Sequence, residues 1–342
     1  MKTMNRYFYK YNSPFELECG EKLEQLEICY HITDNFTTDK KVIWICHALT
    51  ANSNPEEWWP NFVGKGKLFD TDKYSVICAN ILGSCYGSTG PASFDQNGNQ
   101  YLLSFPNITV RDIVRAHDIL RERLGIRHID IVIGGSIGGF QALEWSIMFP
   151  EKIAGMVLLA CNAKVSPWGT AFNETQRMAL FSDPSFEEQN SISGGAKGLE
   201  TARAIALLSY RSYKGYKLTQ SEEDCDKLFA EKACSYQKYQ GKKLKDRFNA
   251  YSYYTLTKSI DSHNVGRGRG GVEKALSQIK AKPLIIGIDS DVLFPLEEQK
   301  FLAENIPNSQ FEIISSDFGH DGFLLEWKLI TAAIKKHIKI IQ

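Results

Sequence analysis

The sequence has no excess of charge of either sign, and this absence narrows its possible partners. Its 342 residues carry 40 lysines and arginines against 40 aspartates and glutamates, so the formal net charge at pH 7 is zero. A neutral chain offers no overall electrostatic attraction to nucleic acid or to an anionic membrane surface. We therefore expect neither nucleic acid nor a membrane as a partner.

Long apolar runs and paired cysteines are missing too. No stretch approaches the roughly 18 apolar residues that a membrane-spanning helix needs, and residues 1–10 are polar rather than typical of a secretion signal. The eight cysteines form no C-x-x-C pair, and several lie in apolar runs, where cysteine behaves as a small buried hydrophobic residue. The sequence predicts a cytoplasmic protein with reduced thiols and no metal site.

Short apolar runs rich in valine and isoleucine recur along the chain and are typical of buried parallel strands. They lie at residues 42–46, 74–81, 128–133, 153–161, 283–288 and 311–315. Helical patterns separate several of these runs: Thr109 begins one helix as its N-cap, and Pro150 ends another that starts at Ile137. Because strands and helices alternate, we predict an α/β fold with a mostly parallel sheet and flanking helices.

The alternation stops between about residues 164 and 271, where helical patterns occur without a convincing strand. These patterns cover residues 201–210, 222–239 and 244–257. We predict a helical lid domain at residues 164–271, inserted into a core domain formed by residues 1–163 and 272–342.

The sharpest local pattern surrounds Ser136, in Gly134-Gly135-Ser136-Ile137-Gly138. It contains G-x-S-x-G between an apolar strand and a helix, the context in which this motif presents a nucleophilic serine. A chain that turns from strand into helix at one residue leaves no space for flanking side chains, which explains the glycines. A phosphate-binding loop is one competing interpretation, but the G-K-[ST] ending and the G-x-G-x-x-G spacing are absent. A structural turn with an idle serine is the other.

A nucleophilic serine needs a histidine base that is itself oriented by an acid, in the chain order Ser, Asp or Glu, His. His320 lies in the loop after the last predicted strand and is the preferred base, with His263 the weaker candidate. The acid should follow the strand at 283–288, where spacing alone favours neither Asp289 nor Asp291.

The oxyanion that forms when serine attacks a carbonyl needs backbone N–H donors. Ile137, the first residue of the helix after Ser136, supplies one. The loop after the strand at 42–46 supplies the other, and Leu49 is its natural donor. His47 precedes Ser136 in the chain, which argues against it as the base, so we interpret it as part of the structure of this loop.

The motifs around these residues resemble the homoserine O-acetyltransferases of the α/β-hydrolase type. The resemblance runs in collinear order over roughly residues 40–325 and rests on the following segments: Cys46-His47-Ala48-Leu49-Thr50, Cys85-Tyr86-Gly87-Ser88-Thr89-Gly90-Pro91, Gln141-Ala142-Leu143-Glu144-Trp145, Phe172-Asn173-Glu174-Thr175-Gln176-Arg177, Asp261-Ser262-His263, Ile288-Asp289-Ser290-Asp291-Val292-Leu293-Phe294-Pro295 and Gly319-His320-Asp321-Gly322-Phe323-Leu324.

The resemblance implies an α/β-hydrolase fold and a ping-pong reaction within methionine biosynthesis. An acetyl group would pass from acetyl-CoA to a serine and then to the hydroxyl of L-homoserine. Carried over to this chain, it implies Ser136 as the nucleophile, His320 as the base and Asp291, rather than Asp289, as the acid.

The resemblance also assigns substrate recognition to Arg177 and Asp321. The chemistry agrees, because the carboxylate and ammonium of an amino acid call for a guanidinium and a carboxylate respectively. No cofactor is implied, since acetyl-CoA is a substrate. A homodimer formed through lid helices is a further implication.

Other functions use the same residues. A homoserine O-succinyltransferase or a serine O-acyltransferase would keep the triad and change one substrate. An ester or thioester hydrolase would release the acyl group to water without an amino acid. A non-catalytic ligand-binding member of the fold is disfavoured, because a pure binder does not need Ser136, Asp291 and His320 together.

Overall fold

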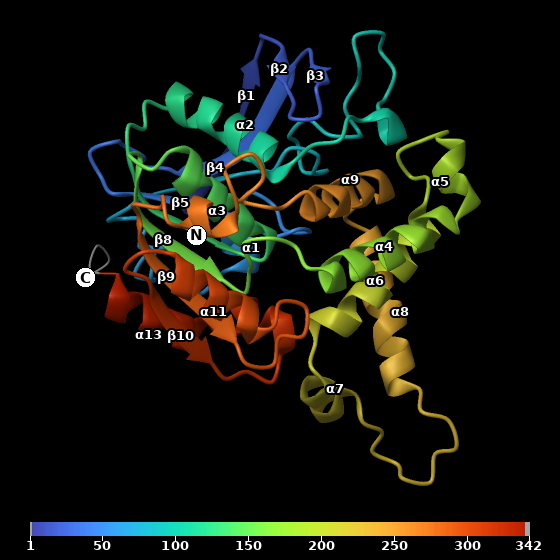
Figure 1. Ribbon diagram of the computed structural model, residues 1–342. Helices are drawn as coiled ribbons and strands as arrows, with labels where there is room; N and C mark the ends of the chain where they lie inside the picture. The colour runs from blue at the N-terminus through green and yellow to red at the C-terminus, as the bar shows by residue number, and fades with distance from the viewer. Residues whose placement is uncertain (1, 339–342) are drawn as a thin grey trace.

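The computed structural model describes residues 2–338, in which an eight-stranded sheet lies between helices and a further group of helices stands beside it (Figure 1). The strand order is β1-β4-β6-β5-β7-β8-β9-β10, and the six strands from β6 to β10 in that order are parallel. Their bounds are β6 (Ser75–Ala79), β5 (Val42–Cys46), β7 (Ile129–Gly135), β8 (Ile153–Leu159), β9 (Lys282–Ile288) and β10 (Gln310–Ile314). All six predicted strands are confirmed, with ends that differ by no more than two residues.

The antiparallel edge of the sheet was not predicted. β1 (Met4–Tyr11) pairs along its whole length with β4 (Leu26–Thr33), which pairs in turn with β6. A two-residue pair, β2 (Phe15–Glu16) and β3 (Lys22–Leu23), lies between them in the chain. Most of β1 is exposed because it is an edge strand, so it lacks the continuous apolar run that marks a covered strand.

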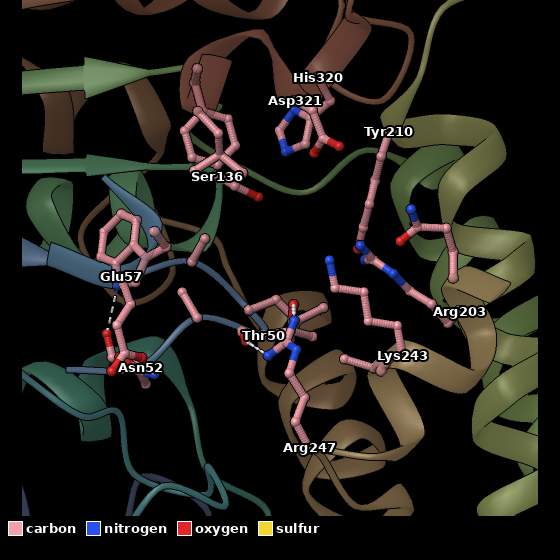
Figure 2. A pocket seen from close by; sticks show the side chains of 18 of the residues that line it. Thr50, Asn52, Glu57, Ser136, Arg203, Tyr210, Lys243, Arg247, His320 and Asp321 are labelled. Atoms are coloured by element: carbon pink, nitrogen blue, oxygen red, sulfur yellow. Dashed lines mark hydrogen bonds between the residues drawn. The ribbon is translucent and has the colours of Figure 1, made fainter. Parts of the chain in front are cut away.

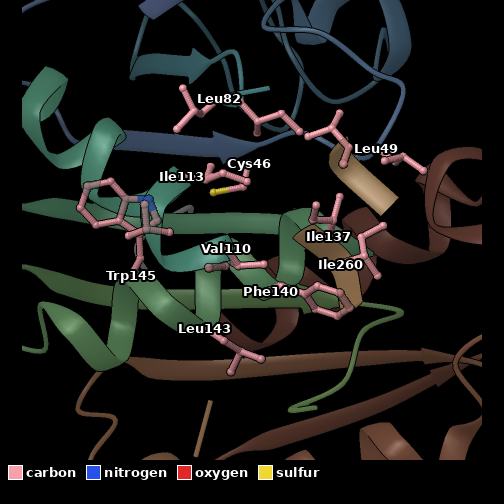
Figure 3. Packing of buried hydrophobic residues seen from close by; sticks show 14 of the residues in the cluster. Cys46, Leu49, Leu82, Val110, Ile113, Ile137, Phe140, Leu143, Trp145 and Ile260 are labelled. Atoms are coloured by element: carbon pink, nitrogen blue, oxygen red, sulfur yellow. The ribbon is translucent and has the colours of Figure 1, made fainter. Parts of the chain in front are cut away.

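The central strands are apolar throughout because helices cover both faces of the sheet. Successive side chains of a strand point to opposite faces, so Val132 of β7 joins one hydrophobic cluster while Ile131 and Ile133 join the other. The first cluster packs against α2 (Val110–Arg123) and α3 (Ile137–Met148) (Figure 3). The second packs against α13 (Trp327–His337). The predicted cap of α2 is confirmed, since Thr109 and Asp112 form a capping box.

Between residues 164 and 261 the structure contains helices and no strand, and we call α4 to α9 the lid helices. Their bounds are α4 (Pro167–Phe181), α5 (Pro184–Glu188), α6 (Ala196–Tyr210), α7 (Tyr213–Gln220), α8 (Lys232–Lys245) and α9 (Ala250–Asp261). The two ends of the segment meet at a β-bridge between Lys164 and Asn264. The division into a core and a lid domain stays a prediction, and residues 1 and 339–342 of the predicted core lie outside the described residues.

All three predicted lid helices have different bounds in the structure. The pattern at 201–210 forms the C-terminal part of α6, which begins at Ala196. Residues 222–231 are not helical, because the Glu222 carboxylate accepts the backbone N–H groups of Glu231 and Lys232 and so folds the segment into a loop before α8. The predicted helix at 244–257 is interrupted after Lys245, and Asn249 caps a new helix by accepting the Ser252 N–H.

The remaining described helices lie on the core and near the site. They are α1 (Pro55–Trp58), α10 (Val272–Leu276), α11 (Leu296–Asn305) and α12 (Gly322–Leu325), with short 3₁₀ turns at Leu102–Ser104 and Gly319–Asp321. Among residues 2–338, no helix is long and apolar enough to cross a membrane.

Candidate active site

Ser136 lies at the turn where β7 passes directly into α3, and its backbone is strained. Its φ of 57° and ψ of −129° put a non-glycine residue in a conformation that L-amino acids rarely adopt. Hydrogen bonds hold the strain in place: the Ser136 N–H donates to the Leu159 carbonyl at 3.0 Å, and its own carbonyl accepts the Gly139 N–H at 2.8 Å. The turn predicted from G-x-S-x-G is therefore present.

The glycines beside Ser136 allow three backbone segments to touch. A Cβ atom on Gly138 would lie 2.2 Å from the carbonyl oxygen of Cys46, at the end of β5. A Cβ atom on Gly134 would lie 2.3 Å from the carbonyl carbon of Gly138. No side chain fits at these distances, so the close approach of β5, β7 and α3 requires glycine at both positions.

The loops that follow β9 and β10 bring Asp291 and His320 together. The Nδ1 atom of His320 lies 2.7 Å from Oδ2 of Asp291, and both side chains are buried. The other carboxylate oxygen, Oδ1, accepts the backbone N–H groups of Leu293 and Phe294 at 2.8 and 3.0 Å. With both oxygens bonded, the carboxylate is fixed, and it holds the imidazole with Nε2 available. Figure 2 shows His320 and Ser136 at the same end of one cavity.

The charges around His320 favour its protonated form. Burial lowers the pKa of this imidazole, but the carboxylates of Asp291 and Asp321 outweigh burial, so its pKa is raised above the usual 6.5. The surroundings of His320 therefore stabilise an imidazolium at this position.

The competing acid and base candidates have other roles. Asp289 is exposed, and its Oδ1 atom accepts the Ser316 N–H at 3.0 Å, which joins the loops after β9 and β10. His263 is buried and stacks on Phe140 with ring centroids 3.9 Å apart. Burial lowers its pKa to about 3, and its Nε2 atom bonds the Asn162 carbonyl, so it is a packing residue and not a second base.

His47 shapes the loop that carries Leu49, as the sequence predicted. Its Nδ1–H donates to the Ala48 carbonyl at 2.9 Å, and its Nε2 accepts the Ile81 N–H at 2.9 Å. Burial lowers its pKa to about 4, so it stays neutral in this double role. Leu49 lines the cavity, and the Ile137 N–H follows Ser136 at the start of α3 while the Ile137 side chain is buried in the core (Figure 3).

The cavity has a volume of about 600 Å³ and lies between the carboxyl ends of the strands and the lid helices. Residues of both parts line it. Those from the core side include Leu49, Thr50, Glu57, Ser136, His320 and Asp321, and those from the lid side include Arg203, Tyr210, Arg211, Lys243 and Arg247.

Arg177 does not line this cavity, which corrects its predicted place in substrate recognition. It is buried on α4, where its Nη2 atom lies 2.6 Å from Asp261 Oδ2 and 2.7 Å from Glu174 Oε2. Its Nε–H also donates to Glu174 at 2.8 Å. Two carboxylates thus bind the Nε and Nη2 atoms of the guanidinium, which joins α4 to α9.

Arg211, which the sequence analysis missed, stands where Arg177 was expected. It directly follows α6 and lines the cavity, and its Nε atom lies 3.2 Å from Oδ2 of Asp321. Asp321 is adjacent to His320 in the chain, so this ion pair lies beside the buried His320–Asp291 pair. A basic residue at the end of a predicted helix is ordinary in a sequence, and only the packing of α6 onto the core singles this one out.

Metal ligation finds no support in the described chain, since residues 2–338 contain no group of three or more histidine, cysteine or acidic side chains arranged to hold an ion. None of the eight cysteines is joined to another in the structure. The groups that the cavity offers are a serine on a strained turn, a histidine–aspartate pair and an arginine–aspartate pair.

The chain is similar to known proteins of one fold. The family described as the alpha/beta hydrolase fold matches residues 41–326. A homoserine O-acetyltransferase of Cyclobacterium marinum is 46% identical over 334 residues, covering 97% of this chain and 95% of the relative. One from Chlorobium chlorochromatii is 38% identical and covers 98% and 96%.

Solved structures share the fold. A homoserine O-acetyltransferase from Staphylococcus aureus aligns with a TM-score of 0.81 and 29% identity, covering 97% of this chain and 95% of the other. Esterase E22 aligns with a TM-score of 0.89 and 20% identity, covering 99% and 100%. Because transferases and esterases share this fold, the fold by itself does not decide where the acyl group goes.

Proposed function

The chain belongs to the homoserine O-acetyltransferase family of the alpha/beta hydrolase fold, and from that premise we propose how its cavity transfers an acetyl group. One observation carries the proposal. The cavity holds Ser136, its base His320 and, beside them, the Arg211–Asp321 ion pair, which offers one positive and one negative group to an amino acid.

In the first half-reaction, His320 Nε2 takes the hydroxyl proton of Ser136, whose oxygen attacks the thioester carbonyl of acetyl-CoA. The backbone N–H groups of Leu49 and Ile137 stabilise the oxyanion, each lowering the barrier by about 3 kcal/mol in comparable sites. The thiolate of CoA then leaves and takes the proton from His320. The acetyl group remains on Ser136 as an ester.

In the second half-reaction, Arg211 binds the carboxylate of homoserine and Asp321 binds its ammonium. Binding of homoserine replaces the Arg211–Asp321 ion pair with two ion pairs, one from each residue to the substrate, so no charge is left without a partner. His320 takes the proton of the homoserine hydroxyl, whose oxygen attacks the acetyl ester. The tetrahedral intermediate collapses, Ser136 regains its proton from His320, and O-acetylhomoserine is released.

Aromatic rings around His320 favour transfer over hydrolysis. The rings of Tyr210, Phe294 and Phe323 lie with their centroids 5.7, 5.2 and 5.3 Å from that of His320. Tyr210 comes from lid helix α6, so the lid closes one side of the base. Apolar walls limit the access of water to the acetyl ester, which leaves the bound hydroxyl as the nucleophile.

A matrix of donors and acceptors tests the proposal. We expect acetyl-CoA with L-homoserine to give the highest kcat/KM, with succinyl-CoA as donor, or serine as acceptor, well below it. CoA release without any amino acid should be slow. A faster release to water than to homoserine would make the protein a hydrolase, and a preference for succinyl-CoA or serine would move it to the corresponding transferase.

We propose that no cofactor takes part, because proton transfer and acyl transfer balance with the two substrates alone. Extensive dialysis against a chelator should leave the turnover with acetyl-CoA and homoserine unchanged. A loss that is restored by a metal ion would contradict this. The cytoplasmic location expected from the sequence stays a prediction.

We also propose a homodimer formed through the lid helices. Several large apolar side chains beside these helices are exposed in the single chain, among them Tyr213 of α7 at 83%, and Leu228 at 84% and Phe229 at 74% in the loop before α8. Exposed apolar area of this kind is typical of an interface. Sedimentation velocity should give twice the mass of one chain, and Leu228→Asp with Phe229→Asp should reduce it to a single chain; a monomeric wild-type protein would refute the dimer.

A further inference from the structure

The lid side of the cavity carries positive charge that the acetyl-transfer steps do not use. Arg203 on α6, Lys243 on α8 and Arg247 just after α8 all line the cavity. Figure 2 shows the three side chains extending from the lid helices on the side opposite Ser136. Within residues 2–338, none of the three forms an ion pair with a carboxylate.

Neither carboxylate that lines the cavity forms an ion pair with these three cations. Asp321 is paired with Arg211. Glu57 accepts hydrogen bonds from the side chains of Asn52 and Asn54 at 2.8 and 3.0 Å. The cavity lining therefore carries four cations, Arg203, Arg211, Lys243 and Arg247, against the two carboxylates of Asp321 and Glu57, which is a local excess of positive charge in a chain whose net charge is zero. Like charges gathered without counter-ions repel one another, and their common use is to bind an anion.

The three cations are held to different degrees. Arg247 is fixed, since its Nη1 atom donates to the Thr50 carbonyl at 2.5 Å and to the Tyr86 hydroxyl at 2.6 Å. Arg203 lies over the ring of Tyr210, with its guanidinium carbon 5.3 Å from the ring centroid. Lys243 is exposed and forms no hydrogen bond to another part of the described chain. The arginines are thus preorganised, while the lysine ammonium is left for a ligand.

We propose that Arg203, Lys243 and Arg247 bind the phosphate groups of the CoA thioester, an inference that rests on the proposed function. CoA carries a pyrophosphate and a 3′-phosphate at its nucleotide end, whereas the arm that leads to its thioester is uncharged. The single carboxylate of homoserine is already matched by Arg211. Three further cations exceed what one acyl carboxylate, such as that of a succinyl group, would require.

Two donors with the same reacting bond test the inference. S-acetyl-N-acetylcysteamine has the thioester and part of the arm of acetyl-CoA but no phosphate. In Lys243→Ala and Arg203→Ala, kcat/KM for acetyl-CoA should fall by about tenfold to a hundredfold more than kcat/KM for S-acetyl-N-acetylcysteamine, as expected for loss of a charge-assisted contact. Arg247 also anchors the loop of Leu49, so its substitution would not separate phosphate binding from loop structure.

The matched control is Lys242→Ala. Lys242 precedes Lys243 on the same helix and is exposed, but it does not line the cavity. Its removal takes away the same charge from the same helix, so it should leave the ratio of the two donors within about twofold of wild type. Raising the ionic strength should increase KM for acetyl-CoA in the wild type and in Lys242→Ala, and less so in Lys243→Ala.

Three outcomes would overturn the inference. An equal loss with both donors would make the lid cations structural. A loss confined to succinyl thioesters, with acetyl-CoA unaffected, would make them a site for an acyl carboxylate. A Lys242→Ala effect as large as that of Lys243→Ala would reduce the site to general surface charge.

Calorimetric titration of CoA keeps this inference apart from the proposed function, because binding needs no acceptor. Weaker binding of CoA to Lys243→Ala than to Lys242→Ala supports the phosphate site even if homoserine proves not to be the acceptor. Equal binding of CoA to both variants and to the wild type overturns it even if homoserine is acetylated.

Discussion

The two sides of the cavity hold their functional groups by different means. On the core side, Ser136, Asp291 and His320 follow the carboxyl ends of the parallel strands β7, β9 and β10, and backbone hydrogen bonds or buried contacts fix each of them. On the lid side, Lys243 and Arg203 project from helices and have no carboxylate partners in the described chain. The difference suggests that the core side sets the chemistry, while the lid side sets which molecules receive it.

The largest effect should come from the core side, in Ser136→Ala. Removal of the nucleophile should lower kcat by about 10⁴-fold or more and abolish the acetyl-enzyme. Intact mass after exposure to acetyl-CoA checks the second point, with Ser182→Ala, an exposed lid serine, as the control that keeps both activity and adduct. An acetyl adduct of normal yield in Ser136→Ala would place the nucleophile elsewhere.

The next effect separates two aspartates of one loop. Asp291→Asn removes the carboxylate that orients His320 and should lower kcat by about 10³- to 10⁴-fold, as in other serine triads. Asp289→Asn alters only the contact with the Ser316 N–H and should retain kcat within about threefold. Steady-state kinetics of the two variants decide the assignment; comparable losses in both would show that the loop geometry, and not the Asp291 carboxylate, is what matters.

A smaller effect should separate two arginines of the lid. Arg211→Ala should raise KM for homoserine about tenfold to a hundredfold and leave acetylation of Ser136 nearly intact. Arg177→Ala should leave that KM nearly unchanged but lower the free energy of unfolding by about 2 kcal/mol, because Asp261 and Glu174 lose a buried partner. Denaturant titration and acceptor kinetics check both; a raised KM in Arg177→Ala alone would restore its predicted role.

The smallest effect is a shift in pH dependence. The pKa of His320 is raised above 6.5 by Asp291 and Asp321, and the base must be neutral, so the rate of Ser136 acetylation should fall as the pH falls through that raised pKa. Asp321→Asn removes one of the two carboxylates and should move this fall to lower pH. The acetylation step is measured without homoserine, so loss of acceptor binding does not enter.

The control for the pH profile is Asp317→Asn. Asp317 lies in the same loop as Asp321, pairs with Lys214 of α7 and does not contribute to the raised pKa of His320. Its profile should coincide with that of the wild type. The raised pKa of His320 also makes the free energy of unfolding depend on pH. The folded protein stabilises the protonated His320, so this contribution to the free energy of unfolding is complete below pH 6.5 and is lost as the pH rises through the folded pKa. If the pH–rate profile of Asp321→Asn equals that of the wild type, Asp321 does not raise the pKa of His320.

Sequence patterns were informative where local geometry decides the structure. Five of the six parallel strands, β5 to β9, are almost entirely buried because both of their faces are covered, so their apolar runs mark them within two residues. β10, at the other edge of the sheet, is only partly buried. The edge strand β1 has no such run, since most of its side chains are exposed. In the lid, residues 222–231 form a loop despite their helical pattern, because Glu222 accepts hydrogen bonds from the backbone N–H groups of Glu231 and Lys232.

The sequence by itself identified the turn at Ser136, because a glycine-rich passage from an apolar strand into a helix is a local pattern. Only the tertiary structure decided that Arg211, and not Arg177, meets Asp321. Both arginines belong to the lid region, and each has a carboxylate within reach. Which carboxylate it reaches depends on how that region packs on the core, where Arg211 and Asp321 come together across more than a hundred residues of chain that no local pattern encodes.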